Sequence, residues 1–294
     1  MVSITIGLLI TAVVVFFAYC SLALYKFRST STFLYGVTQV IPFPVAKAGP
    51  SWVSYSSYLF ELRHTIHYYQ TQQKEDFGSG PGKKHLAQLR QQTLAQVIND
   101  AYVKQLASKN HVSVSSQEVN SHVALVRQQN RLGSSDQVFK DVLSEFWGWT
   151  VDDFKQELKQ QLLSQKVVAK LDTATTARAQ NALTVLNNGA DFATLASQIS
   201  DDISTKPNGG DYGISISQSS SDIAPQVANE LFKLKPGEHS GIINTGYALE
   251  IDKVISIDGS KVHAAHIVFN FKPISSYVNS LKATEKSHAY IKTN

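Results

Sequence analysis

The longest run of apolar residues lies at the N-terminus, where residues 4–25 carry no charged side chain. At ~1.5 Å per residue, a helix of this length spans roughly 33 Å, which is enough to cross the hydrocarbon core of a bilayer. The pattern therefore predicts a transmembrane anchor within residues 1–28. A cleaved signal peptide is the alternative, although the apolar run is long for one and no A-x-A sequence follows it.

A segment rich in Ser, Thr and Pro, residues 29–45, follows the apolar run and is expected to be a linker. Through 46–172 apolar residues then recur mainly at helical spacing, most clearly over about 84–108. Ser115 and Glu118 have the spacing of a capping box, which opens a further helix. The pattern predicts a helical domain across 46–172.

Two strands joined by a tight turn are predicted closer to the C-terminus. Residues 247–255 and 262–269 alternate in the manner of strands, and the Asp-Gly pair at 258–259 is typical of a hairpin turn. Leu249 and Ile251 should pack under helices, so the chain combines helices and strands in an α+β fold. The opposite face of the two strands should be polar and is expected to carry Glu250, Asp252 and His266.

A loop that breaks regular structure, residues 200–213, lies between the two regions and reads SDDISTKPNGGDYG. It follows a short amphipathic helix, DFATLASQI. The adjacent Gly209 and Gly210 allow backbone angles that other residues avoid. Asp202 is therefore expected to be held close to a tight loop. Its alternative role is the capping of a turn.

Composition and charge exclude several classes of function. The formal charge of +4 is spread along the chain, so no basic block is suited to nucleic acid. No Walker loop, GxGxxG motif or metal-type cysteine cluster occurs, and the sequence therefore predicts no cofactor and no metal site. His64 and His67 form H-x-x-H but lack a third ligand. Cys20 is the single cysteine, which excludes an internal disulfide.

Short motifs follow one another in order along the second half of the chain: Ser200 and Asp202 in S-x-D, GGD at 209–211, I-x-P-x-V at 223–227, Phe232, Leu234, G-E-x-S at 237–240, and Thr245 with Gly246. This order resembles the parvulin family of peptidyl-prolyl isomerases. The family pattern is S-x-D or S-x-C, GGD-x-G, hydrophobic-x-P-x-F, F-x-L-x-x-G-E-x-S and T-x-x-G-x-H. The resemblance implies an antiparallel sheet with helices over 173–257.

Two phrases in the helical region carry a second resemblance. They are QTLAQVINDAYVKQLASKNHVSVSSQEV and TVDDFKQELKQQLLSQKVVAKL. They resemble the N-terminal chaperone domain of SurA-type foldases, although this chain has His111 and Val112 where the family tends to have Gly-Ile. The resemblance implies that 46–172 is an all-α chaperone domain.

One strand of the parvulin pattern is displaced. Parvulin domains begin with R-A-x-H-I-L, whose histidine lies in the active site, yet residues 171–180 hold no such strand. The phrase occurs instead at 262–269, where His266 is the matching histidine. We hypothesise a circularly permuted sheet, completed by a strand and a helix from 258–294. A truncated second repeat is the alternative, and a large separation between His266 and Asp202 would refute the permutation.

The parvulin resemblance also implies roles for single residues. Catalytic groups would be Asp202 near the prolyl carbonyl, with Thr245 and His266 in a hydrogen-bond network beneath it. The alternative, purely structural roles are an ordinary buried strand histidine for His266 and a local backbone contact for Thr245. The proline pocket would be lined by Ile223, Val227 and Phe232.

Two departures from the family bear on catalysis. The second family histidine is expected to have no counterpart, because Ala248 stands in its place. The pocket Met and Phe of the family become Ile223 and Val227, which are smaller. Both changes predict weak isomerase activity, with binding of a proline segment retained.

The resulting expectation is a membrane-anchored, extracytoplasmic foldase that acts as a peptidyl-prolyl isomerase and chaperone on unfolded or proline-containing segments of exported proteins. Rotation of a prolyl amide crosses a barrier of ~18–20 kcal/mol without breaking a bond, so it requires neither nucleophile nor metal. A non-catalytic holdase is the alternative, and an envelope scaffold is a third possibility. Lys26 and Arg28 flank the C-terminal end of the apolar run and, by the positive-inside rule, favour a cytoplasmic location for the main domains. That conflicts with export.

Overall fold

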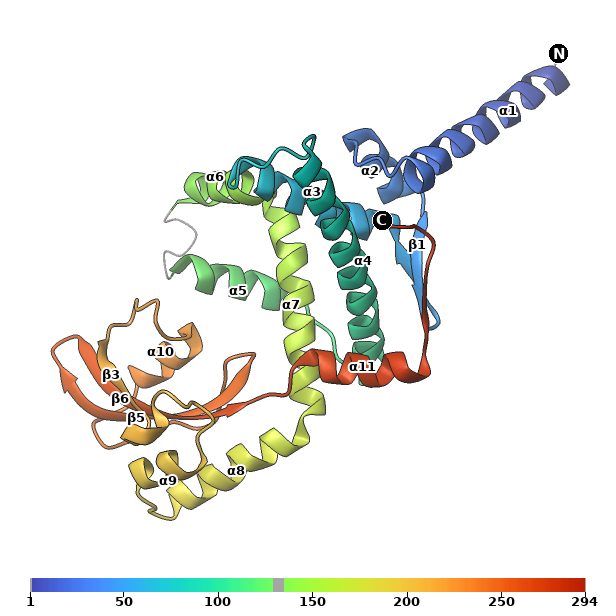
Figure 1. Cartoon of the computed structure of the whole chain (residues 1–294). Helices are drawn as coiled ribbons and strands as arrows, with labels where there is room; N and C mark the ends of the chain where they lie inside the picture. Colours follow the sequence, from blue (N-terminus) through green and yellow to red (C-terminus); the bar gives the residue numbers. More distant parts are fainter. Residues whose placement is uncertain (1, 129–134, 294) are drawn as a thin grey trace. The chain divides into compact units, whose positions relative to one another are not determined.

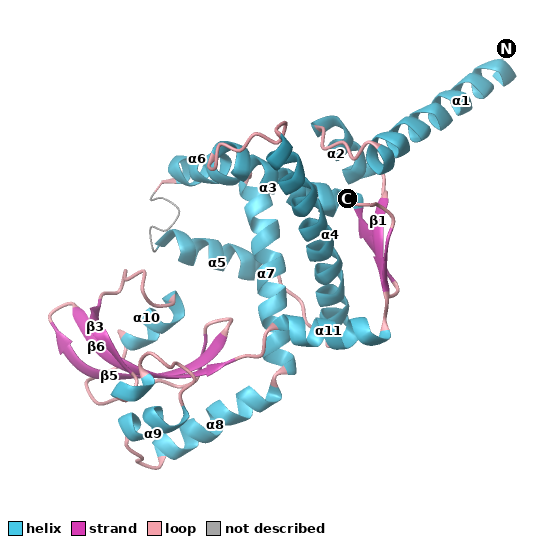
Figure 2. Cartoon of the chain, viewed as in Figure 1, coloured by secondary structure: helices cyan, strands magenta, loops and turns pink. Residues whose placement is uncertain are grey.

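The computed structural model describes residues 2–128 and 135–293, which form two compact units. Unit 1 combines three stretches of the chain, Met1–Gln105, Ser144–Trp149 and Val278–Asn294. Unit 2 comprises Leu106–Leu143 and Thr150–Tyr277. Figures 1 and 2 show the elements of both units.

Unit 1 begins with an apolar helix, α1 (Val2–Ser21), which continues into a π-helical turn at Leu22–Lys26. Its long apolar side chains are exposed, among them Leu8 at 66% and Leu9 at 69%. Exposure of such side chains to water is unfavourable by roughly 1.5–3 kcal/mol each. Within the described part of the chain, this is the one helix that is long and apolar enough to cross a membrane.

The segment expected to be a linker, 29–45, is partly helical. Helix α2 covers Thr32–Val40. The Ser31 hydroxyl accepts a hydrogen bond from the Leu34 amide at 3.3 Å and so caps the helix. Leu34 is buried and packs α2 against the rest of unit 1. The Ser, Thr and Pro content of the segment did not predict this helix.

A small sheet in unit 1 joins the two ends of the chain. Strands β1 (Pro44–Ala48) and β2 (Ser51–Ser54) form a hairpin, and β7 (Ser287–Ala289) pairs antiparallel with β1. Only part of 258–294 therefore completes the second sheet, contrary to the prediction for that segment. From Val278 onward the chain belongs to unit 1, because β1 offers a free edge that β7 fills.

Two long helices, α3 (Tyr55–Thr71) and α4 (Gly80–Lys109), supply much of the remaining core of unit 1. Tyr55 and Tyr102 are fully buried, and the Tyr55 hydroxyl donates to the Leu24 carbonyl at 2.6 Å. Helix α11 (Ile274–Thr284) begins in unit 2 and ends in unit 1.

The helices of unit 2 include one, α5, that begins at the cap predicted from the sequence. They are α5 (Ser116–Gln128), α6 (Asp136–Trp147, whose last residues belong to unit 1), α7 (Val151–Leu171), α8 (Thr173–Asn187), α9 (Phe192–Ile199) and α10 (Pro225–Leu231). The Glu118 carboxylate accepts from the Ser115 amide at 2.8 Å, and the Glu118 amide donates to the Ser115 hydroxyl at 3.2 Å. The predicted capping box is confirmed.

A four-stranded antiparallel sheet forms the centre of unit 2. Its strands are, in spatial order, β3 (Asp211–Ile216), β6 (Lys261–Asn270), β5 (Ala248–Asp258) and β4 (Ile243–Asn244). The predicted hairpin joins β5 to β6 at Gly259, which has a φ of +56°. In Figures 1 and 2, α8 and α9 lie on one face of the sheet and α10 on the other.

The alternation predicted for β5 and β6 is confirmed. Leu249, Ile251 and Ile267 are buried in one core with residues of α8 and α9. The opposite face packs Val254 and Ala264 against α10 in a second core and also carries the predicted polar residues. Strand β6 thus lies between β3 and β5 in the sheet. The relation of this order to that of the family stays a prediction.

Candidate functional site

The loop at 200–213 is fastened to strand β6 by backbone and side-chain hydrogen bonds. The Asp201 amide donates to the Val268 carbonyl at 2.8 Å, and the buried Ser200 hydroxyl accepts from the Val268 amide at 3.1 Å. The His266 amide donates to the Gly210 carbonyl at 2.9 Å. These contacts place the loop beside the side chain of His266.

Gly210 is required by the closeness of this approach. Its φ is +82°, and a Cβ atom there would lie 2.2 Å from the carbonyl oxygen of His266. Any side chain would therefore push β6 away from the loop. Gly210 of the sequence motif is explained by the fit of this loop against the strand, and Gly209 by its closeness to Ala193 of α9.

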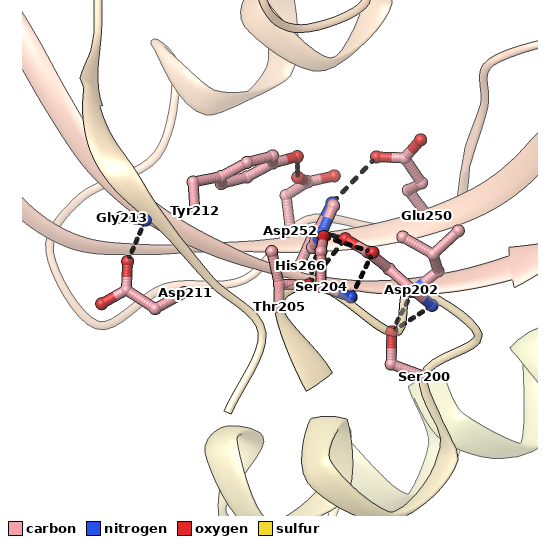
Figure 3. A network of polar contacts seen from close by, with 11 residues as sticks. Ser200, Asp202, Ser204, Thr205, Asp211, Tyr212, Gly213, Glu250, Asp252 and His266 are labelled. Carbon is pink, nitrogen blue, oxygen red and sulfur yellow. Dashed lines mark hydrogen bonds and ion pairs between the residues drawn. The ribbon is translucent and has the colours of Figure 1, made fainter. Parts of the chain in front are cut away.

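Asp202 accepts hydrogen bonds at both carboxylate oxygens (Figure 3). Oδ1 accepts from the amide and hydroxyl of Ser204 at 3.0 and 2.6 Å. Oδ2 accepts from the Thr205 hydroxyl at 2.7 Å and lies 2.9 Å from Nε2 of His266. Burial by itself raises the pKa of Asp202, but the hydrogen bonds from Ser204, Thr205 and His266 outweigh it and hold the pKa well below its usual value.

His266 lies at the centre of the polar network and is 8% exposed. Its Nε2 faces Asp202 and lies 3.0 Å from the Thr205 hydroxyl, while Nδ1 lies 3.5 Å from Oε2 of Glu250. That separation is long for a hydrogen bond, so Glu250 acts mainly through its charge. Burial lowers the pKa of His266, yet Glu250 and then Asp202 raise it above its ordinary value overall.

Tyr212 and Asp252 complete the network beside His266, and both are labelled in Figure 3. The Tyr212 ring centroid lies 4.2 Å from that of His266, and its hydroxyl donates to Oδ1 of Asp252 at 2.8 Å. Asp252 is fully buried. Burial and the charge of Glu250 raise the pKa of Asp252 to about 7. Burial and the nearby carboxylates raise the pKa of Tyr212 as well.

Among the residues predicted to be catalytic, Asp202 and His266 meet, whereas Thr245 takes no part in this network. The Thr245 hydroxyl donates to the Ala248 carbonyl at 3.1 Å and so stabilises the turn in which Thr245 lies. The hydroxyl beside His266 belongs to Thr205, and the contact of Thr245 is the local backbone contact given as its alternative role. Thr205 lies in the loop fastened to β6, and only the folded loop brings it to the histidine.

The predicted pocket residues separate into two groups. Ile223 and Val227 are 5% and 1% exposed and belong to the core under α10. Phe232 lies at the edge of that core and lines a pocket of 530 Å³ together with Leu125 and Pro225. Of the three, Phe232 is the residue that this pocket exposes to a ligand.

Glu250 is an alternative to Ala248 for the position of the second family histidine. Counting along T-x-x-G-x-H from Thr245 places Ala248 at the glycine and Glu250 at the histidine. In the structure Glu250 contacts His266, while Ala248 is buried at the start of β5. Which of the two matches the family histidine stays a prediction. Alternation along β5 did identify Glu250 and Asp252 as polar-face residues, whereas nothing in the sequence singled out Tyr212.

The arrangement supplies polar groups without an activated nucleophile. A carboxylate held ionised, a hydroxyl and a buried imidazole converge from one loop and one strand. Such groups can stabilise the altered charge on a twisted amide, which is the demand that prolyl rotation makes.

Comparison with known families gives two matches. Residues 1–168 match the model of the SurA-like N-terminal domain, and residues 161–256 match that of the PPIC-type PPIASE domain. The first covers more than half of the 294 residues. A search of curated proteins gives no significant match.

Solved structures of foldases are among those similar to the chain. The peptidylprolyl isomerase PrsA from Bacillus anthracis is 20% identical, with 65% of this chain and 86% of that chain covered and a TM-score of 0.22. PrsA from Bacillus cereus is 17% identical over 69% and 76%, with a TM-score of 0.24. The foldase protein PrsA from Streptococcus pneumoniae strain Canada MDR_19A is 22% identical over 66% and 75%, with a TM-score of 0.22.

The two family models cover adjoining parts of the chain, and the second contains both the loop of Asp202 and most of strand β5. Together they assign to one chain a chaperone-type domain and a domain for prolyl isomerisation. The chain therefore belongs to the SurA-type foldases, and its second half carries a peptidyl-prolyl isomerase domain of the PPIC type.

Proposed function

We propose that this isomerase is anchored in the cell membrane by α1 and that its two units work outside the cytoplasm on exported proteins. Its substrates are unfolded segments that contain proline, and it both holds them and speeds rotation of their prolyl bonds. The apolar, exposed helix at Ile6–Lys26 supports the anchor. The match to a SurA-like domain supports a role in holding unfolded chains.

Asp202, His266 and Thr205 form the proposed catalytic group. The contact of 2.9 Å between Asp202 and His266 is the observation that carries this proposal. It joins a motif at 200–213 to a strand more than fifty residues later in the chain, at the place where the parvulin pattern requires a histidine. In this proposal the Asp202 carboxylate lies near the prolyl carbonyl, where its negative charge disfavours the charge-separated resonance form of the planar amide and so favours the twisted one.

The substrate is proposed to enter along the side of α10. Phe232 and Pro225 line the 530 Å³ pocket there and offer apolar surface suited to a proline ring. Ile223 and Val227 lie beneath and keep α10 in place. Thr245 stays a weaker candidate, because its hydroxyl is already used within its turn.

A non-catalytic holdase is the second candidate. Glu250 supports it, because a carboxylate replaces the second family histidine and changes the charge beside His266. Because Ile223 and Val227 are buried, less apolar surface is available for binding a proline ring than in the family pocket. In that case the parvulin unit binds clients without accelerating rotation.

An isomerisation assay on a proline-containing peptide separates the two candidates. We expect the full chain to raise the rate above the uncatalysed one, and His266→Ala and Asp202→Ala to lower it by about 100-fold or to background. His263→Ala is the matched control, since His263 lies on the same strand and pairs with Asp211 at 2.8 Å but is 40% exposed. A rate at background for the wild type would remove the catalytic proposal.

Suppression of aggregation of an unfolded client tests the holdase. If it persists unchanged in His266→Ala and Asp202→Ala while no isomerisation is measured, the holdase is the correct function. If both activities are lost together and circular dichroism shows a folded chain, the same surface serves both.

The side of the membrane requires its own experiment. Lys26 and Arg28 at the end of the helix favour a cytoplasmic location, in conflict with the proposal. Protease added to intact cells should digest units 1 and 2 if they are extracytoplasmic. Full protection, with digestion only after lysis, would refute that location.

A further inference from the structure

Three side chains that can ligate a metal meet on the polar face of the sheet in unit 2. Glu250 and Asp252 come from β5 and His266 from β6, and one donor atom of each lies within 4.8 Å of the other two. Antiparallel pairing sets Asp252 opposite His266, with Glu250 two residues away on the same face. The sequence shows no metal motif because the ligands lie on two different strands.

Two of the donor atoms are buried and make no hydrogen bond. Oδ2 of Asp252 and Nδ1 of His266 have no hydrogen-bond partner within the part of the chain that the structure describes. Asp252 is fully buried and His266 is more than nine-tenths buried. A buried acceptor left unsatisfied costs about 1–3 kcal/mol, and more if charged. A cation between these atoms would satisfy both lone pairs.

The remaining atoms of the same side chains are held in the way that metal ligands usually are. Nε2 of His266 faces Oδ2 of Asp202 at 2.9 Å, and the Tyr212 hydroxyl donates to Oδ1 of Asp252 at 2.8 Å (Figure 3). In protein metal sites the ligating histidine commonly donates its second N–H to a carboxylate, and ligating carboxylates accept hydrogen bonds. These contacts orient both ligands toward the shared space.

We propose that Glu250, Asp252 and His266 bind a divalent transition-metal cation of the zinc class. One imidazole nitrogen with two carboxylates suits such ions, whereas Mg²⁺ and Ca²⁺ prefer sites made of oxygen alone. A tetrahedral ion with ligands at ~2.0–2.2 Å holds its donors roughly 3.3–3.5 Å apart. Glu250 Oε2 and His266 Nδ1 are 3.5 Å apart, so this pair already has the required spacing.

Charge also favours a cation there. Glu250 and Asp252 lie on the same strand two residues apart, and Asp202 approaches His266 from the other side. Two positive charges would neutralise the two ligating carboxylates. Three protein ligands leave a fourth position open, on the side of Glu250, whose side chain is 15% exposed. The proposal rests on these side chains and is independent of isomerase activity.

Direct titration tests the site. The full chain, purified in detergent and stripped with a chelator, is titrated with ZnCl₂ in a calorimeter and with Co²⁺ as a visible-absorption probe. We expect saturation at a single ion per chain. Asp252→Asn and Glu250→Gln should each weaken binding by about tenfold or more and change the Co²⁺ spectrum.

His263→Gln is the matched control, because this exposed histidine also pairs with an aspartate on the same sheet. Its binding curve should equal that of the wild type. The proposal is overturned if the wild type binds no ion, if both ligand variants bind unchanged, or if His263→Gln alone abolishes binding, which would indicate an adventitious surface site. If Asp252→Asn does not fold, the binding curve of Glu250→Gln decides the test. The Glu250 side chain reaches the surface, so its replacement should leave the fold intact.

Discussion

Replacing Gly210 with alanine tests whether close approach of the loop to β6 builds the candidate site. Two effects add in this variant. A φ of +82° costs a non-glycine residue about 1–2 kcal/mol. The new Cβ would also lie 2.2 Å from the carbonyl oxygen of His266, so the loop and the strand must separate by about 1 Å in a close-packed interior.

Gly213→Ala is the matched control for backbone strain alone. Gly213 has a φ of +69°, but nothing lies within 4 Å of the position that its Cβ would take. We expect Gly213→Ala to destabilise unit 2 by about 1–2 kcal/mol. Gly210→Ala should cost about 2 kcal/mol more, through overpacking and loss of the hydrogen bond from the His266 amide.

Hydrogen exchange of peptides from β6 is the appropriate assay. The three tryptophans, Trp52, Trp147 and Trp149, all lie in unit 1, so their fluorescence does not report on unit 2. An excess of 2 kcal/mol raises the open population of β6 by roughly 30-fold over Gly213→Ala. Isomerase activity should fall with it. Equal exchange in the two variants would refute the argument that this contact positions His266.

Two further substitutions probe unit 2. Asp172→Asn should destabilise unit 2 by about 1–3 kcal/mol. The Asp172 carboxylate is 2% exposed and accepts hydrogen bonds from the amide and hydroxyl of Thr175. It also accepts one from the Lys272 amide at 2.8 Å. Burial raises the pKa of Asp172, but these hydrogen bonds lower it overall, so its contribution is present above ~pH 4 and is lost as the pH falls through the folded-state pKa. Urea unfolding by circular dichroism at pH 7 and below pH 4 should show the difference between wild type and variant shrink, and a constant difference would contradict this. Arg178→Ala should cost no more than about 1 kcal/mol in thermal unfolding despite its two contacts with Asp201, because the guanidinium is half-exposed, and a larger loss would show that the pair is coupled to the loop.

Much of the candidate site was accessible to sequence reasoning because it depends on short-range patterns. The S-x-D and GGD motifs identified the loop, and alternation along β5 and β6 assigned Glu250, Asp252 and His266 to one face. Thr205 and Tyr212 were missed. Their roles depend on how the loop folds back on β6, and this contact joins residues about sixty positions apart.

The sequence by itself determined the apolar N-terminal helix, the capping box at Ser115 and the hairpin at Gly259, because helical period, caps and tight turns depend on neighbouring residues. Only the tertiary structure decided which side chains and which strands contact one another. It set Thr205 and not Thr245 beside His266, buried Val227 under the sheet, and paired β7 with β1. Those outcomes follow from register and from which strand edge is free, and both are properties of the assembled sheet that no local pattern contains.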